Sequence, residues 1–150
     1  MANISLPEFA DKLNEIMPRV MREFMKRQTN ELCKGKITLP QFFILNYLEK
    51  EDQSRMTDIA HFLNVSTAAA TGIVDRLVRL GYVERVFQPQ DRRIIKIKLN
   101  SKGLELMKNI NTQKRQMIID IFGKISQEER QDYLKILMRI HEILKREEKG

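Results

Sequence analysis

The sequence has little of what extracellular and membrane-spanning proteins need. Its 150 residues include one cysteine, no tryptophan, four prolines and six glycines. One cysteine cannot build a disulfide framework, which fits a reducing cytoplasm. No apolar run approaches the roughly 18 residues of a membrane span, and the N-terminus lacks the basic segment and apolar core of a signal peptide. We therefore expect a cytoplasmic protein without a membrane partner.

Groups for catalysis or metal binding are also scarce. We find no nucleophile beside a base, no glycine-rich phosphate loop and no carboxylate pair for acid–base chemistry, so we expect no enzyme. His61 and His141 have no Cys or His at ligand spacing, so we expect neither a metal nor a cofactor. Cys33 has only Lys34 and Lys36 nearby to favour a thiolate. A structural thiol and a redox sensor stay open as alternatives for it.

Positive charge is what the chain has in excess. Lys and Arg number 27 against 20 Asp and Glu, a net charge of +7, and 42% of the residues are hydrophobic. The segment from Arg55 to Leu99 holds eight of the cations and four of the anions. Such an excess favours a polyanion partner, because neutralised phosphates release condensed counterions. A solvated basic surface would give the same count.

Residues 56–99 have the order of a winged helix-turn-helix. We expect Thr57 to cap a short helix and Asn64 to form the turn, since Asn tolerates the left-handed conformation. Ser66 is placed to cap a second helix, which Gly81 ends. Two strands of alternating polarity then flank the polar turn QPQDRR, so this stretch predicts a basic hairpin after the helices.

The second helix has two different faces. Apolar residues recur at helical spacing on one face, which we expect to be buried: Ala70, Ile73, Leu77 and Leu80. The opposite face carries short side chains: Thr67, Ala68, Thr71, Gly72 and Asp75. Short side chains let a helix backbone lie close inside a DNA major groove. We expect the groove contacts to come from Ser66, Thr67, Ala68 and Thr71, whose methyl groups favour A·T pairs.

Two motifs in this stretch carry a family resemblance. In the hairpin, Asp91-x-Arg93 is followed after five residues by Leu99. The segment ATGIVDRLVRLGYVER contains the second motif, made of Thr71, Asp75, Arg76, Leu77, Gly81 and Arg85. Together they resemble the MarR-type transcriptional regulators, and the order of the flanking helices extends the resemblance over nearly the whole chain. The sequence departs from the family at Asn100, where Thr is usual, and at Gly72, where a long polar residue is common.

The hairpin and the end of the second helix supply the expected backbone contacts. We assign phosphate binding to five cations: Arg76, Arg79, Arg92, Lys96 and Lys98. Arg93 is our candidate for insertion into the minor groove, whose negative potential attracts Arg, with Asp91 orienting it. The alternative for Asp91 and Arg93 is an ion pair that only stabilises the turn.

Four more helices surround this stretch. Capping boxes of Ser or Thr with Glu or Gln three residues on predict a helix over 5–32, one opening at Thr38 and one from Ser126 to about 146. Asn100 is placed to cap the fourth, which ends near Gly123. Pro18 should kink the first helix, because proline has no amide hydrogen and crowds the preceding turn.

The terminal helices predict a dimer. The last helix is apolar well beyond one stripe, so both of its sides need cover, and a second copy of the chain is the simplest source. The resemblance implies the same arrangement. We therefore expect a mainly α protein with a small β wing: a winged domain over 37–100 and a helical dimerisation region formed by 1–36 and 101–150. Its dimer contacts are assigned to Phe9, Leu13, Tyr133, Leu137, Ile140 and Leu144.

The function that follows is a homodimeric, sequence-specific repressor on an inverted-repeat operator in double-stranded DNA. The resemblance implies a small-molecule effector, such as a phenolic or aromatic acid, between the dimer helices and the winged domains. Four residues are assigned to its pocket: Met17, Met21, Phe42 and Tyr47. Met stripes also serve ordinary packing, so that use stays open. A redox switch at Cys33 and a winged-helix protein-interaction module are the alternatives.

Overall fold

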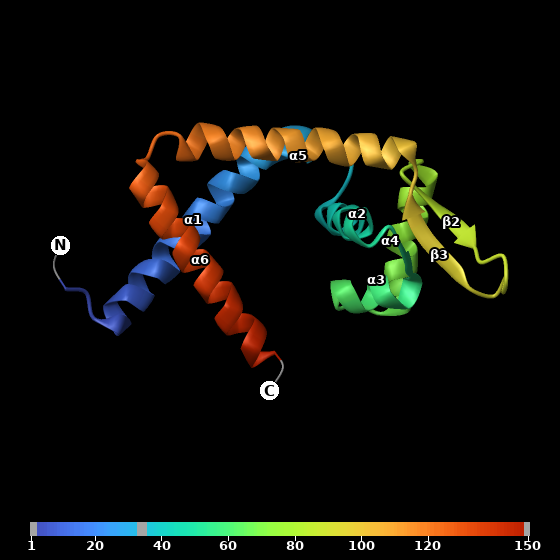
Figure 1. The fold of residues 1–150 in the computed structure, drawn as a ribbon, viewed down its shortest axis with the longest axis horizontal. Coiled ribbons are helices and arrows are strands. Elements are labelled where there is room, and N and C mark those ends of the chain that lie inside the picture. The colour runs from blue at the N-terminus through green and yellow to red at the C-terminus, as the bar shows by residue number, and fades with distance from the viewer. Residues whose placement is uncertain (1–2, 33–35, 149–150) are drawn as a thin grey trace. The chain divides into compact units, whose positions relative to one another are not determined.

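The computed structural model describes residues 3–32 and 36–148, apart from the side chains of 28–32. By Cα proximity the chain forms two units, Met1–Gln113 and Lys114–Gly150. The prediction of a mainly helical chain with a small β wing is confirmed. The elements follow in this order (Figure 1): α1 (Leu6–Leu32), α2 (Leu39–Glu51), β1 (Gln53–Arg55), α3 (Met56–Leu63), α4 (Thr67–Arg79), β2 (Val83–Phe87), β3 (Ile95–Leu99), α5 (Ser101–Phe122) and α6 (Gln127–Glu147).

The three strands form one antiparallel sheet in the order β1-β3-β2. In the hairpin, β2 and β3 pair from Val83 opposite Leu99 to Phe87 opposite Ile95. β1 lies on the other side of β3. The sequence pattern predicts β2 and β3 but not β1, because three polar residues carry no alternation to mark a strand.

Helices α2, α3 and α4, the sheet and the start of α5 enclose one hydrophobic core. Fully burying a large aliphatic side chain contributes roughly 1.5–3 kcal/mol, so a core of this size sustains the winged domain. Its buried members are Ile37, Phe42, Ile44, Leu45, Leu48, Ile59, Ala60, Ala70, Val74, Leu77, Tyr82, Val83, Ile97, Leu99, Met107 and Ile110. This core fixes α4 and the hairpin relative to each other.

Two of the predicted capping boxes open α2 and α6. At α2, Thr38 Oγ1 accepts the backbone N–H of Gln41 at 3.4 Å, and the Gln41 side chain accepts the N–H of Thr38 at 2.8 Å. Ser126 and Glu129 make the same pair of bonds at α6. The backbone hydrogen bond from Ser126 is the main reason why the pKa of Glu129 lies below its usual value.

The start of α3 differs from expectation. Thr57 does not cap this helix, which begins one residue earlier, at Met56. Arg55 occupies the N-cap position and makes no side-chain cap bond. The reason is that β1 runs directly into α3, so the residue at the junction is fixed by strand pairing with Lys96 and not by capping chemistry.

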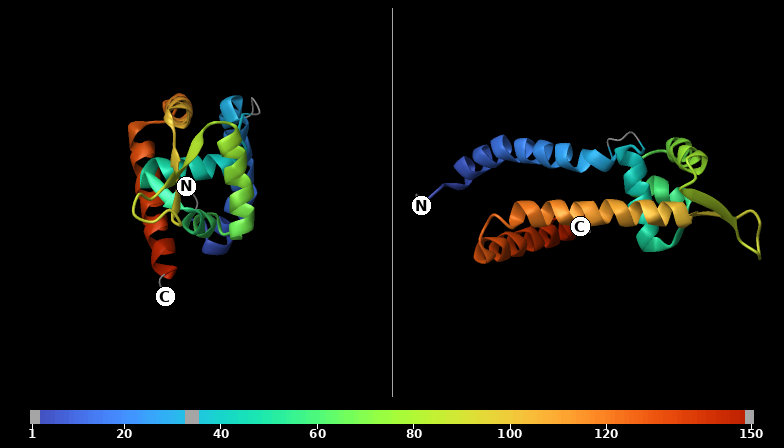
Figure 2. Two further views of the ribbon diagram at one scale, coloured as in Figure 1. Left: turned by 90° about the vertical axis from the view of Figure 1, so that its right-hand side faces the viewer. Right: turned by 90° about the horizontal axis from the view of Figure 1, so that it is seen from above.

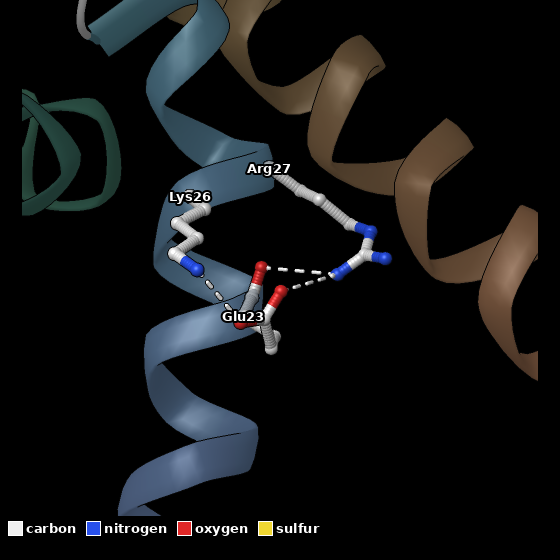
Figure 3. A network of polar contacts seen from close by, with 3 residues as sticks. All are labelled: Glu23, Lys26 and Arg27. Carbon is white, nitrogen blue, oxygen red and sulfur yellow. Dashed lines mark hydrogen bonds and ion pairs between the residues drawn. The ribbon is translucent and has the colours of Figure 1, made fainter.

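Helix α1 exposes most of the apolar side chains described in it and opens with the expected bonds between Ser5 and Glu8. It continues through Pro18 to Leu32. Near its C-terminal end, Glu23 accepts a hydrogen bond from Lys26 Nζ at 2.9 Å and pairs with Arg27 (Figure 3). The bond from Lys26 lowers the pKa of Glu23. Pairs this exposed contribute little to stability, so α1 gains little from them.

The second unit holds the end of α5 and all of α6. The rings of Phe122 and Tyr133 lie 5.4 Å apart, and Arg130 Nη1 donates to the carbonyl oxygens of Phe122, at 3.0 Å, and Ile125. These bonds close the C-terminal end of α5. None of the described residues of α6 is buried. No helix within residues 3–32 and 36–148 is long and apolar enough to cross a membrane.

Candidate nucleic-acid interface

Local sequence chemistry sets the start of α4. Asn64 ends α3 in the left-handed conformation, with φ 54°, as the sequence predicts. Ser66 then caps α4, its Oγ accepting the backbone N–H of Ala69 at 3.1 Å. The helix-turn-helix prediction is therefore confirmed.

The buried face of α4 is rotated from the one that we expect. Ala70, Val74 and Leu77 are completely buried, whereas Ile73 is half-buried and Leu80 is 40% exposed. The expectation for Leu80 is wrong because α4 ends at Arg79 and Leu80 is its C-cap. Spacing alone did not single out Val74, because steps of three and four residues lead from Ala70 to Ile73 and to Val74 alike.

This rotation changes which residues face outward. Thr71 and Asp75 are half-buried, and the Thr71 hydroxyl donates to the Thr67 carbonyl at 2.7 Å. Ser66 and Thr67 are exposed at the start of the helix. Steps of three and four residues place the remaining exposed residues on one face. That face, here called the outward face of α4, consists of Ala68, Ala69, Gly72, Arg76 and Arg79.

Gly72 lies in the middle of the outward face without a structural requirement for glycine. A Cβ built at this position would meet nothing within 4 Å, and its φ is not positive. Glycine inside a helix costs roughly 0.5–1 kcal/mol relative to alanine. The contrast is Gly103 in α5, where a Cβ would lie 2.1 Å from the carbonyl oxygen of Tyr82, so the close approach requires glycine.

Arg85 of β2 joins α4 to the hairpin. Its guanidinium hydrogen-bonds the Asp75 carboxylate, and the two form an ion pair. A hollow of about 650 Å³ lies here, lined by Ala69, Gly72, Ile73, Asp75, Arg76, Val78, Arg79 and Arg85. The sequence analysis assigned no structural contact to Arg85. Strand alternation nevertheless places Arg85 on the same side of β2 as the buried Val83, toward the helices.

The wing extends beyond α4 in both Figure 1 and the right-hand view of Figure 2. Asp91 Oδ1 accepts the backbone N–H of Arg93 at 3.0 Å, two residues along the turn. Asp91 therefore shapes the turn through the Arg93 backbone and not through its guanidinium. Asp91, Arg92 and Arg93 are all exposed.

The lysines of β3 lie on the other side of the sheet from Arg85. Lys98 pairs with Glu84 at 3.4 Å, and Lys96 lies opposite Val86 in the register. The expected alternation of β3 is confirmed for Ile97 and Leu99, which are buried, while Ile95 is 40% exposed. The cations of the hairpin are thus divided between its two faces.

Asn100 connects the wing to α5. Its Oδ1 accepts the backbone N–H of Gly103 at 2.8 Å, which confirms the predicted cap, and its amide nitrogen donates to the Gly81 carbonyl. Gly81 has φ 79°, the left-handed conformation expected of the residue that ends the second helix. One side chain therefore ties the end of the α4 segment to the start of α5.

The remaining candidate residues are spread over several elements. Phe42 is buried in the core, and Tyr47 stacks on Phe62 with ring centroids 4.4 Å apart, while Met17 and Met21 are exposed on α1. The expected dimer contacts are exposed, apart from half-buried Leu13: Phe9, Tyr133, Leu137, Ile140 and Leu144. The effector pocket and the dimer stay predictions.

Two further candidates concern redox chemistry and metal binding. Cys33 and Lys34 lie outside the described residues. His61 and His141 are exposed, and residues 3–32 and 36–148 hold no group of three His, Cys, Asp or Glu that could bind a metal ion.

Comparison with known proteins decides the family. The sequence model of the MarR family matches residues 37–95, which contain the helix-turn-helix and most of the wing. Over this segment the chain matches the MarR family. The HTH-type transcriptional repressor YetL of Bacillus subtilis is 28% identical over 141 residues, covering 94% of this chain and 79% of YetL. The expectation of a MarR-family transcriptional regulator, and not an enzyme, is confirmed.

Solved structures share the MarR-family fold. A MarR family protein from Bacillus stearothermophilus has a TM-score of 0.83 and 21% identity, over 94% of this chain and 99% of that one. A mutant of MarR from E. coli, complexed with operator DNA, has a TM-score of 0.67 and 21% identity, over 91% of this chain and 98% of that one. At these identities the likeness establishes the winged fold.

Proposed function

We propose that this MarR-family regulator is a homodimeric repressor that binds an inverted-repeat operator. The observation that carries the proposal is the outward face of α4, where Ala68, Ala69 and Gly72 leave the helix backbone bare beside Arg76 and Arg79. A major groove about 12 Å wide admits a helix, and a bare backbone lets that helix sit deep in it. The operator complex of the similar E. coli protein supports DNA as the partner.

In the major groove, the proposed contacts come from the N-terminal half of α4. Ser66 and Thr67 are exposed there and offer hydroxyl groups, and Ala68 offers a methyl group. Thr71 uses its hydroxyl on the Thr67 carbonyl, so it presents its methyl group to a thymine. Arg76 and Arg79 follow at the C-terminal end of the helix and bind phosphates.

The wing supplies the second set of contacts. Arg93 enters the minor groove, and Asp91 holds the turn that presents it. Arg92 and Lys96 bind the flanking phosphates. Lys98 joins them with a weaker contribution, because Glu84 already neutralises part of its charge.

The helical region over 1–36 and 101–150 forms the dimer in this proposal. Leu134 and Met138, on one side of α6, are 58% and 59% exposed, and Leu137 and Leu144, on another, are 43% and 56% exposed. A helix with exposed apolar residues on more than one side is poorly suited to water and requires cover. Two copies related by a two-fold axis place their α4 helices about 34 Å apart, which matches an inverted repeat. Repression follows the example of the similar YetL.

A small phenolic or aromatic acid releases the proposed dimer from DNA. Its pocket is assigned to Met17, Met21, Phe42 and Tyr47, of which Phe42 lies in the core of the winged domain, and the stacked Tyr47–Phe62 pair offers an aromatic surface. The ligand needs only to favour a spacing of the two α4 helices that mismatches the groove repeat. A differential affinity of a few kcal/mol is enough for that shift. The proposed role also places the protein in the cytoplasm, where a bacterium holds its chromosome.

The test is selection of bound duplexes from a random library, repeated over a range of salt concentrations. We expect an inverted repeat with A·T-rich half-sites and an affinity that falls steeply with salt. Weak, sequence-independent binding by reduced protein without added ligand would contradict the proposal. Mass measurement of the selected complex must also give two chains per duplex.

A further inference from the structure

The last cross-strand pair of the hairpin, here called its last rung, is apolar and exposed to solvent. Phe87 and Ile95 lie directly opposite each other in the register and are 56% and 40% exposed. They share a face of the sheet with the rungs Val83–Leu99 and Arg85–Ile97, whose apolar members are buried. The apolar face of the hairpin thus continues beyond the core that it serves. A phenyl ring on this rung is not required by the winged domain.

Arg85 shows which way this face is turned. It stands two residues before Phe87, so both side chains lie on the same side of β2. Arg85 reaches Asp75 of α4 and lines the hollow along the outward face of that helix. Phe87 and Ile95 therefore extend the surface of α4 toward the wing turn, which carries Arg92 and Arg93.

We propose that Phe87 and Ile95 pack against deoxyribose rings of the operator. The inference rests on the proposed function, in which α4 enters a major groove and the wing turn enters the neighbouring minor groove. The sugar–phosphate ridge between the two grooves must then pass beside the last rung. Deoxyribose presents C–H groups between successive phosphates, so an apolar pair suits the ridge there, and the exposed Arg92 of the adjoining turn is available for a neighbouring phosphate, whereas Arg85 is already paired with Asp75.

The proposed apolar contact predicts a mutational effect that differs from the loss of a phosphate-binding cation. Phe87→Ala should weaken binding of the selected operator duplex about fivefold to tenfold, the effect of losing part of a buried phenyl ring. The slope of log affinity against log salt should not change, because no phosphate loses its cation. Phe87→Leu, which keeps an apolar side chain, should bind within about twofold of the wild type.

Val86→Ala is the matched control. Val86 is half-buried in the same strand but points to the opposite face, across from Lys96. It should leave operator affinity unchanged if the contact belongs to the face of Phe87. Circular dichroism and the thermal midpoint of each variant establish that the assays compare folded proteins.

Two results would overturn the inference. The first is wild-type affinity for Phe87→Ala. The second is a loss of affinity that appears together with a change in sedimentation, which would make the rung a contact between two copies of the chain. Failure of the wild-type protein to select any duplex would instead overturn the proposed function, so the two failures are distinguishable.

Discussion

The winged domain and the terminal helices differ in the solvent exposure of their apolar side chains. In α2, α3 and α4, the large aliphatic residues Ile44, Ile59 and Leu77 are completely buried. In α6, the same kinds of residue, among them Ile136 and Leu137, are 57% and 43% exposed. Periodicity marks an apolar face equally well in both regions, but it does not say what covers that face. One region is covered by its own chain, and the other is the region that we propose a second copy of the chain covers.

The largest expected effect tests the uncovered region. Leu137→Glu places a charge on the α6 face proposed to join two copies, so the dimer should dissociate at micromolar concentration. Operator affinity should fall by about 10²–10⁴, because linked binding of two half-sites is lost. Sedimentation and duplex titration measure the two effects. Lys135→Gln, a polar change on the same helix, is the control, and a Leu137→Glu variant that stays dimeric would contradict the proposed interface.

The next effect tests the covered region. Leu77→Ala opens a cavity in the core and should lower the free energy of unfolding by about 2–5 kcal/mol. Leu80→Ala, three residues later in sequence, should cost less than about 1 kcal/mol, because Leu80 is 40% exposed beyond the end of α4. Urea unfolding measures both. Equal losses would mean that the buried face of α4 is the one that spacing alone predicts.

A smaller effect is expected where the winged domain meets DNA. Arg93→Ala should weaken operator binding about tenfold and reduce the salt slope by about one, because one phosphate-region cation is removed. Lys145→Ala, in the last turn of α6, removes the same charge elsewhere. Unchanged affinity and slope for Arg93→Ala, or an equal change for Lys145→Ala, would exclude the proposed role of the wing turn.

Features that depend on neighbouring residues were predictable from the sequence. The caps at Thr38, Ser66 and Ser126 and the left-handed Asn64 follow from side chains that bond to backbone a few residues away. The strands β2 and β3 follow from their alternation. These features gave the winged fold before any tertiary contact was known.

Features that depend on distant residues were not predictable in the same way. β1 forms because Ser54 pairs with Ile97, more than forty positions on, and nothing within Gln53–Arg55 marks it. The Asp75–Arg85 pair joins two residues that both stood in recognised motifs, but only the packing of β2 on α4 brings them together. The outward face of α4 was misplaced for the same reason, since the core decides how the helix is rotated.

Gly72 gives the smallest expected effect and the sharpest comparison of fold with function. Gly72→Ala should raise the free energy of unfolding by about 0.5–1 kcal/mol, because alanine favours the helix and its Cβ meets no atom within 4 Å. The same methyl group should weaken operator binding about threefold, because in the proposed complex it stands where α4 approaches the groove most closely. Asn109→Ala, at an exposed position of α5, should stabilise the protein similarly without changing affinity.

A Gly72→Ala variant that is more stable and binds as tightly as the wild type would mean that this backbone position does not touch DNA. A variant that is more stable and binds more weakly would mean that glycine is kept there for binding at a cost to the fold.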